Sequence, residues 1–135
     1  MTAGSHRFFI DRGMGSKIIP DGLRERGWEV VTMNERYGQR VGEGMADPDW
    51  ITEATAQGEV CLCKDSQIAK RPAEASAVRV AGARVFAVSN ANISGETMLS
   101  WLLRNEARIL RRAGKPGPYV YGIYEDDVRP LNLRE

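Results

Sequence analysis

The chain has 135 residues, of which 42% are hydrophobic and 27% are charged, values typical of one soluble globular domain. No apolar run approaches the roughly 20 residues that a spanning helix needs, and the start lacks a secretory signal, so we expect a cytoplasmic protein without a membrane partner. With 19 basic and 18 acidic residues, the net charge of +1 excludes nucleic-acid binding through whole-molecule charge alone.

The first part of the chain predicts a flexible start followed by a strand–helix–strand unit. Residues 1–6 are expected to be flexible, and the largely apolar run RFFI at 7–10 predicts a buried strand that stops at Asp11. A helix is predicted over about 17–26, with Gly27 ending it in the left-handed conformation. A second strand follows over 28–32.

The middle of the chain predicts a surface loop, a helix and a third strand. Residues 34–44 are polar and glycine-rich and are expected to form the loop. Asp47 is expected to cap the following helix, with Pro48 in its first turn. The third strand covers 60–63 and includes Cys61 and Cys63, which point to one face and are expected to be buried free thiols. Asp65 stands just beyond it.

The last part predicts two more strands and two helices. A helix over about 72–81 leads to a strand over 85–88, and Ser94 is expected to cap the longest helix, which ends near Gly114. A fifth strand is predicted over 119–124, after which the last residues can return as a hairpin. This alternation predicts an α/β domain with a mainly parallel five-stranded sheet and helices on both faces.

Three aspartates are the candidate site residues, because ligands of such sheets gather beyond the carboxyl ends of the strands. Asp11 follows the first strand, Asp65 follows the third, and Asp47 opens the helix before the third. Crowded carboxylates need a cation, and hard oxygen ligands suit Mg²⁺ or Mn²⁺. The structural alternatives are a helix cap for Asp47 and turns for the other two, made with the backbones of Gly13 and Gln67.

Three segments around these aspartates resemble the acidic signatures of PIN-like domains, a family that includes VapC-type toxins: FFIDR at 8–12, DPDWITEA at 47–54 and VCLCKD at 60–65. The tail PGPYV at 116–120 is similar to the end of a compact PIN-like subgroup. The resemblance implies one PIN-like nuclease domain over residues 7–135. It also implies a metal-dependent endoribonuclease with Asp11, Asp47 and Asp65 on the metals, an RNA substrate cut by metal-activated water, and a cognate antitoxin.

Two features depart from the family pattern. The further acid usual between the first two aspartates has only Glu35 or Glu43 as candidates, and Cys63 replaces the usual hydroxyl residue. These departures leave open a catalytically silent module that binds RNA or a protein. A receiver-like domain, with Asp65 as phosphoacceptor, is a further alternative.

Other side chains are candidates for supporting roles. Arg12, Lys64 and Arg36 are candidates for neutralising phosphate charge. Asp49 is expected to favour the helix dipole, and Ser89, Asn90 and Asn92 are candidates for binding water or ribose. A basic stripe on the long helix is expected to contact RNA or an acidic partner, and the apolar face around Trp101 is a candidate homodimer surface. The stripe comprises Arg104, Arg108, Arg111 and Arg112.

Overall fold

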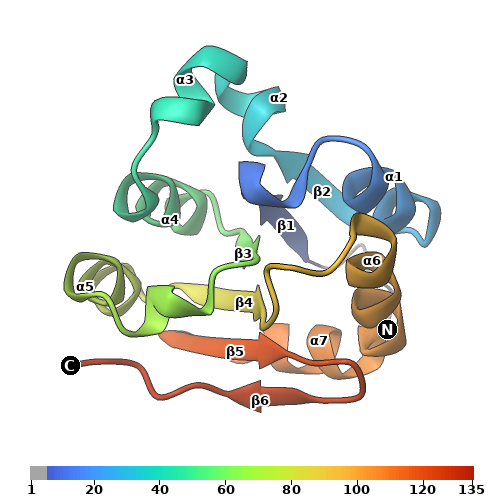
Figure 1. The fold of residues 1–135 in the computed structure, drawn as a ribbon. Helices are drawn as coiled ribbons and strands as arrows, with labels where there is room; N and C mark the ends of the chain where they lie inside the picture. Colours follow the sequence, from blue (N-terminus) through green and yellow to red (C-terminus); the bar gives the residue numbers. More distant parts are fainter. Residues whose placement is uncertain (1–5) are drawn as a thin grey trace.

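A computed structural model describes residues 6–135, so the predicted flexible start lies outside the described residues except for His6. Its centre is a single sheet in the order β2-β1-β3-β4-β5-β6 (Figure 1). The first five strands in this order are parallel, and β6 pairs antiparallel with β5. The predicted α/β class is confirmed, with a sixth strand formed by the returning hairpin. The strands are β1 (Arg7–Ile10), β2 (Glu29–Thr32), β3 (Val60–Cys63), β4 (Arg84–Val88), β5 (Tyr119–Ile123) and β6 (Val128–Pro130).

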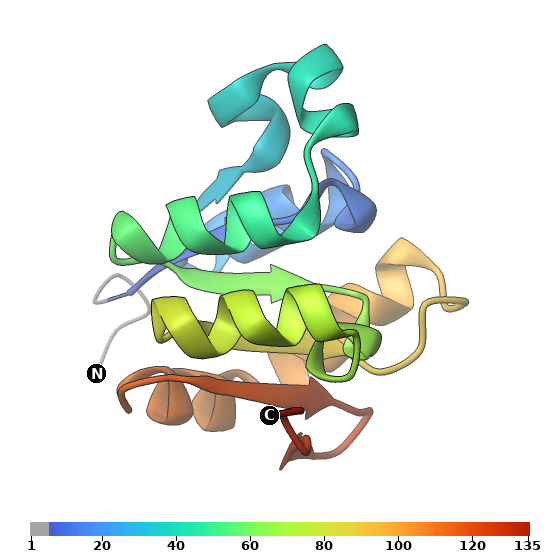
Figure 2. The ribbon, with the colours of Figure 1, turned by 90° about the vertical axis from the view of Figure 1, so that its left-hand side faces the viewer.

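Helices cover both faces of the sheet, as predicted. Helices α1, α6 and α7 pack on one face, while α4 and α5 lie side by side on the other (Figures 1 and 2). The short helices α2 and α3 project beyond the sheet (Figure 1). The helices are α1 (Ile18–Glu25), α2 (Met33–Tyr37), α3 (Gln39–Gly44), α4 (Asp47–Ala56), α5 (Pro72–Ala81), α6 (Gly95–Arg104) and α7 (Glu106–Ala113). Over residues 6–135, none of them has both the length and the apolarity to cross a membrane.

Alternation along the strands divides the apolar residues into two cores. In β1, Phe8 and Ile10 join the core under α1, α6 and α7, whereas Phe9 joins the core under α4 and α5. Cys61 and Cys63 share the second core as free, fully buried thiols, as the sequence predicts. Each inner strand is therefore buried on both sides, which explains its continuous apolar sequence.

The segment predicted as a loop over 34–44 is instead helical. Thr32 is the N-cap of α2, where its hydroxyl accepts from the Glu35 backbone N–H at 3.0 Å and the Glu35 carboxylate accepts from the Thr32 backbone N–H at 3.0 Å. This reciprocal capping box satisfies two N–H groups that would otherwise lack partners. It starts a helix in a segment whose composition favours a loop.

The prediction of one long helix after Ser94 is also wrong, because the helix is broken into α6 and α7 at Asn105. The Ser94 hydroxyl does accept from the Thr97 backbone N–H, so the predicted cap is confirmed. The buried Asn105 side chain donates to the carbonyl oxygens of Trp101 at 2.9 Å and Tyr124 at 2.8 Å. These bonds tie the break to the end of β5.

The chain order reverses between β1 and β3. From β1 the chain adds β2 on one side, and it then returns to place β3 on the other. In parallel sheets such a switch point opens a crevice beyond the carboxyl ends of the two strands. Asp11 and Asp65 follow these two strands.

Candidate active site

All three candidate aspartates lie at the carboxyl edge of the sheet. Asp11 follows β1 directly, and its backbone N–H donates to the Leu62 carbonyl of β3 at 3.0 Å. Asp65 stands two residues beyond β3 and is the N-cap of a 3-10 helix, η3 (Ser66–Ala69). Asp47 is the first residue of α4, the helix that precedes β3. Short, rigid elements thus bring three acids to the switch point.

Asp11 carries the most perturbed carboxyl group of the three. Its side chain is 13% exposed, and within residues 6–135 its Oδ1 atom has no hydrogen-bond partner. Burial, and then the negative charge of Asp47, raise the pKa of Asp11 from 3.8 to about 6, against the opposing effect of Arg12. Asp11 and Asp47 therefore lie within electrostatic range of each other. The Oδ1 atom of Asp11 has no hydrogen bond that a cation would have to replace, and its nearest charged neighbour is Arg12 Nη1 at 4.0 Å.

Asp47 does not cap its helix. Ala46 is the N-cap of α4 and makes no side-chain cap, so the predicted capping role of Asp47 is wrong. Its Oδ1 atom instead accepts from the indole N–H of the fully buried Trp50 at 2.8 Å. This bond uses one carboxylate oxygen and fixes the side chain beside the second core.

Asp65 makes the turn that its sequence position suggests, and it also binds an arginine. Its Oδ1 atom accepts from the Gln67 backbone N–H at 3.0 Å. Its Oδ2 atom accepts from Arg71 Nη1 at 2.6 Å, and Arg71 lies 3.8 Å from the Glu74 carboxylate. Both oxygens of Asp65 are thus engaged by the protein itself.

The donor set fits a hard divalent cation, although the acids do not converge on one point. Throughout the described part of the chain, no three Asp, Glu, His or Cys side chains form a ready metal cluster. Burial raises the pKa of the nearby Cys63 thiol well above its usual value, so that residue stays a thiol. Carboxylate oxygens without thiolate suit Mg²⁺ or Mn²⁺, and the unpartnered Asp11 oxygen offers such a cation a first ligand.

Lys64 lies beside Asp11, whereas Arg12 Nη1 lies 4.0 Å from Asp11 Oδ1 and spends its hydrogen bonds on other groups. A side-chain carbon at Gly13 would lie 3.3 Å from Asp11 Oδ2 and 3.6 Å from Lys64 Cε, so both side chains border the same glycine. Lys64 also lines a cavity of about 330 Å³. Arg12 Nη1 donates to the carbonyl oxygens of Gly42 at 3.0 Å and Met45 at 3.2 Å. Its predicted part in phosphate neutralisation is therefore replaced by a tether between β1 and the end of α3.

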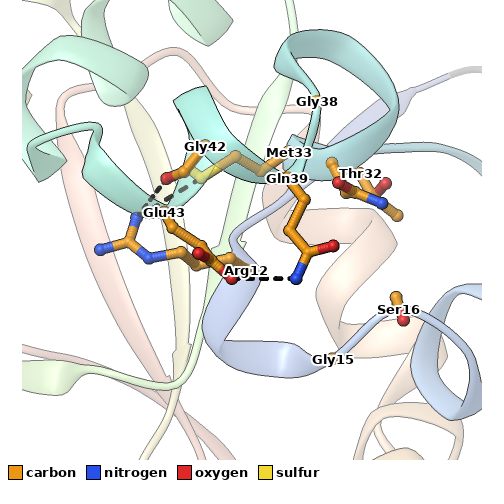
Figure 3. Close-up of a pocket in the computed structure, with 10 residues that line it drawn as sticks. Arg12, Gly15, Ser16, Thr32, Met33, Gly38, Gln39, Gly42 and Glu43 are labelled. Atoms are coloured by element: carbon orange, nitrogen blue, oxygen red, sulfur yellow. Dashed lines mark hydrogen bonds between the residues drawn. The ribbon is translucent and has the colours of Figure 1, made fainter.

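A second pocket, of about 230 Å³, lies between Arg12 and helices α2 and α3 (Figure 3). None of the three aspartates lines it. Glu43 does, and it accepts from Gln39 Nε2 at 3.2 Å. Glu35 is occupied by its capping box and by Arg24, whose Nη2 donates to it at 2.7 Å. Both bonds fall on Oε1 of Glu35, so the capping box and Arg24 fix this side chain at the start of α2, and its role as a further ligand stays a prediction.

The remaining candidates divide into buried and exposed groups. Arg36 binds the buried Glu59 through both of its terminal nitrogens and stacks over Phe9, so its predicted phosphate role is wrong. Asp49 is exposed in the first turn of α4. Ser89 follows β4 directly at the same edge as the acids, and the Asn90 side chain accepts from the Asn92 backbone N–H at 2.9 Å.

The four arginines of the predicted stripe are not equivalent. Arg104 Nε lies 2.7 Å from the Asp126 carboxylate, and Arg108 donates to the Asn105 side chain at 3.2 Å. Arg112 packs over the Tyr121 ring, with 5.3 Å to its centroid. Within residues 6–135, Arg111 is the one of the four that is exposed and has no ion pair, side-chain hydrogen bond or ring contact. The stripe thus loses the charge of Arg104 to an ion pair, while Arg108 and Arg112 contact neutral side chains. Trp101 is partly buried against the first core, and its predicted role in a homodimer stays a prediction.

Sequence reasoning missed the partners of the acids. Arg71 and Glu74 lie next to Asp65 because η3 turns the chain back toward the start of α5. Glu59, whose side chain is 0% exposed and which binds both Arg36 and Arg7, was likewise not anticipated. The only signal for Arg71 is an arginine six residues beyond the aspartate, which is too common to single it out.

Comparison with known proteins gives two matches. A family described as "PIN like domain" matches residues 6–90. A protein of Mycobacterium tuberculosis named "Putative ribonuclease VapC45" is 30% identical over 128 residues, which cover 95% of this chain and 93% of the relative. No solved structure gives a significant match to the chain.

Proposed function

The chain belongs to the PIN-like domain family, and on this premise we propose that it is an endoribonuclease dependent on Mg²⁺ or Mn²⁺. The observation that carries the proposal is the buried Asp11 carboxylate, which has an unpartnered oxygen at the switch point of a parallel sheet. A carboxyl group whose pKa is raised by burial and by a neighbouring acid, at the switch point of a sheet, is a candidate for function. The similarity to a protein named as a ribonuclease supports RNA as the substrate.

The proposed site uses the three aspartates to hold the cation and Lys64 to bind phosphate. Asp11 offers its free oxygen, Asp47 its second oxygen, and Asp65 the carboxylate that Arg71 now contacts. A bound divalent cation would supply positive charge to the scissile phosphate and make an attacking water more acidic. Lys64, beside the same glycine as Asp11, would neutralise part of the phosphate charge. No side-chain nucleophile is needed.

RNA cleavage by three matched proteins tests this proposal. Wild type should cut RNA with Mn²⁺ and not with EDTA, and Asp11→Asn should lose about 100-fold or more of the rate, since even outer-shell partners of a metal can cost that much. Asp49→Asn should keep the wild-type rate, because Asp49 is exposed. The measurement is the rate of loss of intact RNA on a gel.

The alternative is a catalytically silent PIN-like module that binds RNA or a protein. It is favoured by the hydrogen bond from Arg71 to Asp65. It is also favoured by the lack, among residues 6–135, of three Asp, Glu, His or Cys side chains grouped as metal ligands. RNA binding by wild type with no loss of intact RNA beyond that seen in EDTA would establish this alternative. The family match gives no support to a receiver-like domain.

We also propose that the protein acts in the cytoplasm as the toxin of a toxin–antitoxin pair. The similarity to a VapC-named ribonuclease over nearly the whole of both chains supports this role. Expression should arrest growth, and co-expression of a small protein encoded beside it should relieve the arrest. Growth unaffected by the active nuclease would remove the toxin role and leave the nuclease. Light scattering would test the homodimer for which the sequence offers the face around Trp101.

A further inference from the structure

Arg71 is the cation in closest contact with a candidate ligand. It is the N-cap residue of α5, and its Nη1 atom lies 2.6 Å from Asp65 Oδ2. The same nitrogen lies 3.8 Å from Glu74, one helical turn further along. The side chain of Arg71 is 45% exposed, so it reaches the acids from the solvent side.

Three carboxylates act on this one guanidinium. The hydrogen bond to Asp65 raises the pKa of Arg71, and the charges of Asp65, Glu74 and Asp47 contribute in the same direction. Two of the three acids belong to the proposed metal site. Arg12 donates to backbone carbonyls and lies 4.0 Å from Asp11, and Lys64 borders Gly13, so within the described residues Asp65 has its ion pair with Arg71. Arg71 therefore stands where positive charge is needed in the metal-free protein.

We propose that Arg71 is an internal counter-ion that holds Asp65 in the metal-free protein and has to release it for a divalent cation to bind. The inference rests on the proposed metal-dependent function. Arginine keeps its charge at all relevant pH values, so it cannot yield by losing a proton and has to move. Glu74 gives it a second acid, so Arg71 keeps an ion pair after leaving Asp65. The arrangement makes Arg71 a positioning residue that lowers the affinity for metal.

Calorimetric titration of Mn²⁺ without RNA tests the competition directly. Arg71→Met keeps much of the aliphatic length and removes the charge, so the Kd for Mn²⁺ should fall roughly two- to fivefold, the range expected for an exposed ion pair. Lys70→Met is the matched control, because it removes the same charge one residue away. Lys70 is exposed and makes no ion pair in the described part of the chain, so its Kd should stay at the wild-type value.

The outcomes separate this inference from the proposed function. A Kd that is unchanged or weaker in Arg71→Met, while wild type binds Mn²⁺, overturns the role of Arg71 and leaves the nuclease intact. An equal tightening in Lys70→Met also overturns it, because the effect is then general electrostatics. If neither wild type nor Arg71→Met binds Mn²⁺, the metal-dependent function fails as well. Binding seen only in Arg71→Met supports the inference in its strongest form.

Discussion

The carboxyl group of Asp11 makes the stability of the metal-free protein depend on pH. An acid whose pKa is raised on folding keeps its proton longer in the folded state than in the unfolded state. Between about pH 4 and pH 6 the folded protein therefore binds more protons, and its stability falls as the pH rises through this window. Above it, the folded state carries the whole cost of an ionised, buried carboxylate.

Asp11→Asn should accordingly stabilise the metal-free protein at neutral pH. The rise in the pKa of Asp11 from 3.8 to about 6 corresponds to roughly 3 kcal/mol, so the variant should gain up to about that much in its free energy of unfolding at pH 7. The gain should vanish below about pH 4, where Asp11 is protonated in both states. Urea unfolding in EDTA at the two pH values measures it.

The matched control is Asp49→Asn, which changes an exposed acid in the first turn of α4. It should leave the difference in stability between the two pH values as in wild type. A variant at Asp11 that is less stable than wild type at pH 7 would contradict the account. Asp11 would then be a structural acceptor, and not a group held at an electrostatic cost.

At the residue scale, the sequence predicts where acids stand but not what they contact. The positions of Asp11 and Asp65 can be predicted because each follows an apolar run, and the carboxyl ends of parallel strands meet at one edge of the sheet. The partners of these acids depend on turns. The Arg71 contact requires η3, and the Arg12 tether requires α3, neither of which has a clear sequence pattern. Long, flexible side chains reach too many alternatives for spacing alone to choose one.

At the scale of elements, the helix boundaries set by glycine are well predicted and the breaks set by side chains are not. Gly27 follows the C-cap residue of α1 and has φ +89°, a conformation that suits glycine, and the sequence predicts this helix end. The helix α2 and the break at Asn105 each depend on a side chain that replaces a backbone partner. Composition alone gives a loop for the first and a continuous helix for the second.

Asn105→Ala should therefore destabilise the junction between α6 and α7. Its buried amide donates to the carbonyl oxygens of Trp101 and Tyr124, and an alanine would leave the Tyr124 carbonyl without this partner. Leaving a buried acceptor unpaired costs about 1–3 kcal/mol, and we expect a loss of about 2 kcal/mol in the free energy of unfolding. Urea unfolding followed by circular dichroism gives this value.

Asn92→Ala is the matched control for this substitution. Asn92 is exposed, and its hydrogen bond to the Asn90 side chain uses the backbone N–H, which alanine keeps. Its effect should stay within about 0.5 kcal/mol. Equal effects of the two substitutions would mean that the Asn105 amide does not hold the junction, and that the break has another cause.

At the scale of the molecule, alternating strands and helices predict a parallel sheet covered on both faces, but not the strand order. The order decides which acids share the switch point, because β1 and β3 are neighbours only when β2 lies on the outer side of β1. Local periodicity contains no information on this choice. It follows from long-range packing of α1 on one face and α4 on the other.

The two cores share every inner strand, so we expect them to unfold together. Trp28 and Trp101 lie on the face of α1, α6 and α7, whereas Trp50 is fully buried on the other face. Trp50→Phe leaves fluorescent reporters on the first face alone, and the double variant Trp28→Phe with Trp101→Phe leaves one on the second. In each protein the urea midpoints from fluorescence and from circular dichroism should coincide, as for two-state unfolding. Trp50→Phe is expected to lower the fluorescence midpoint and the circular dichroism midpoint together, because it removes the hydrogen bond to Asp47. A fluorescence midpoint well below the circular dichroism midpoint in only one protein would show that this face loosens first, which shared strands should prevent.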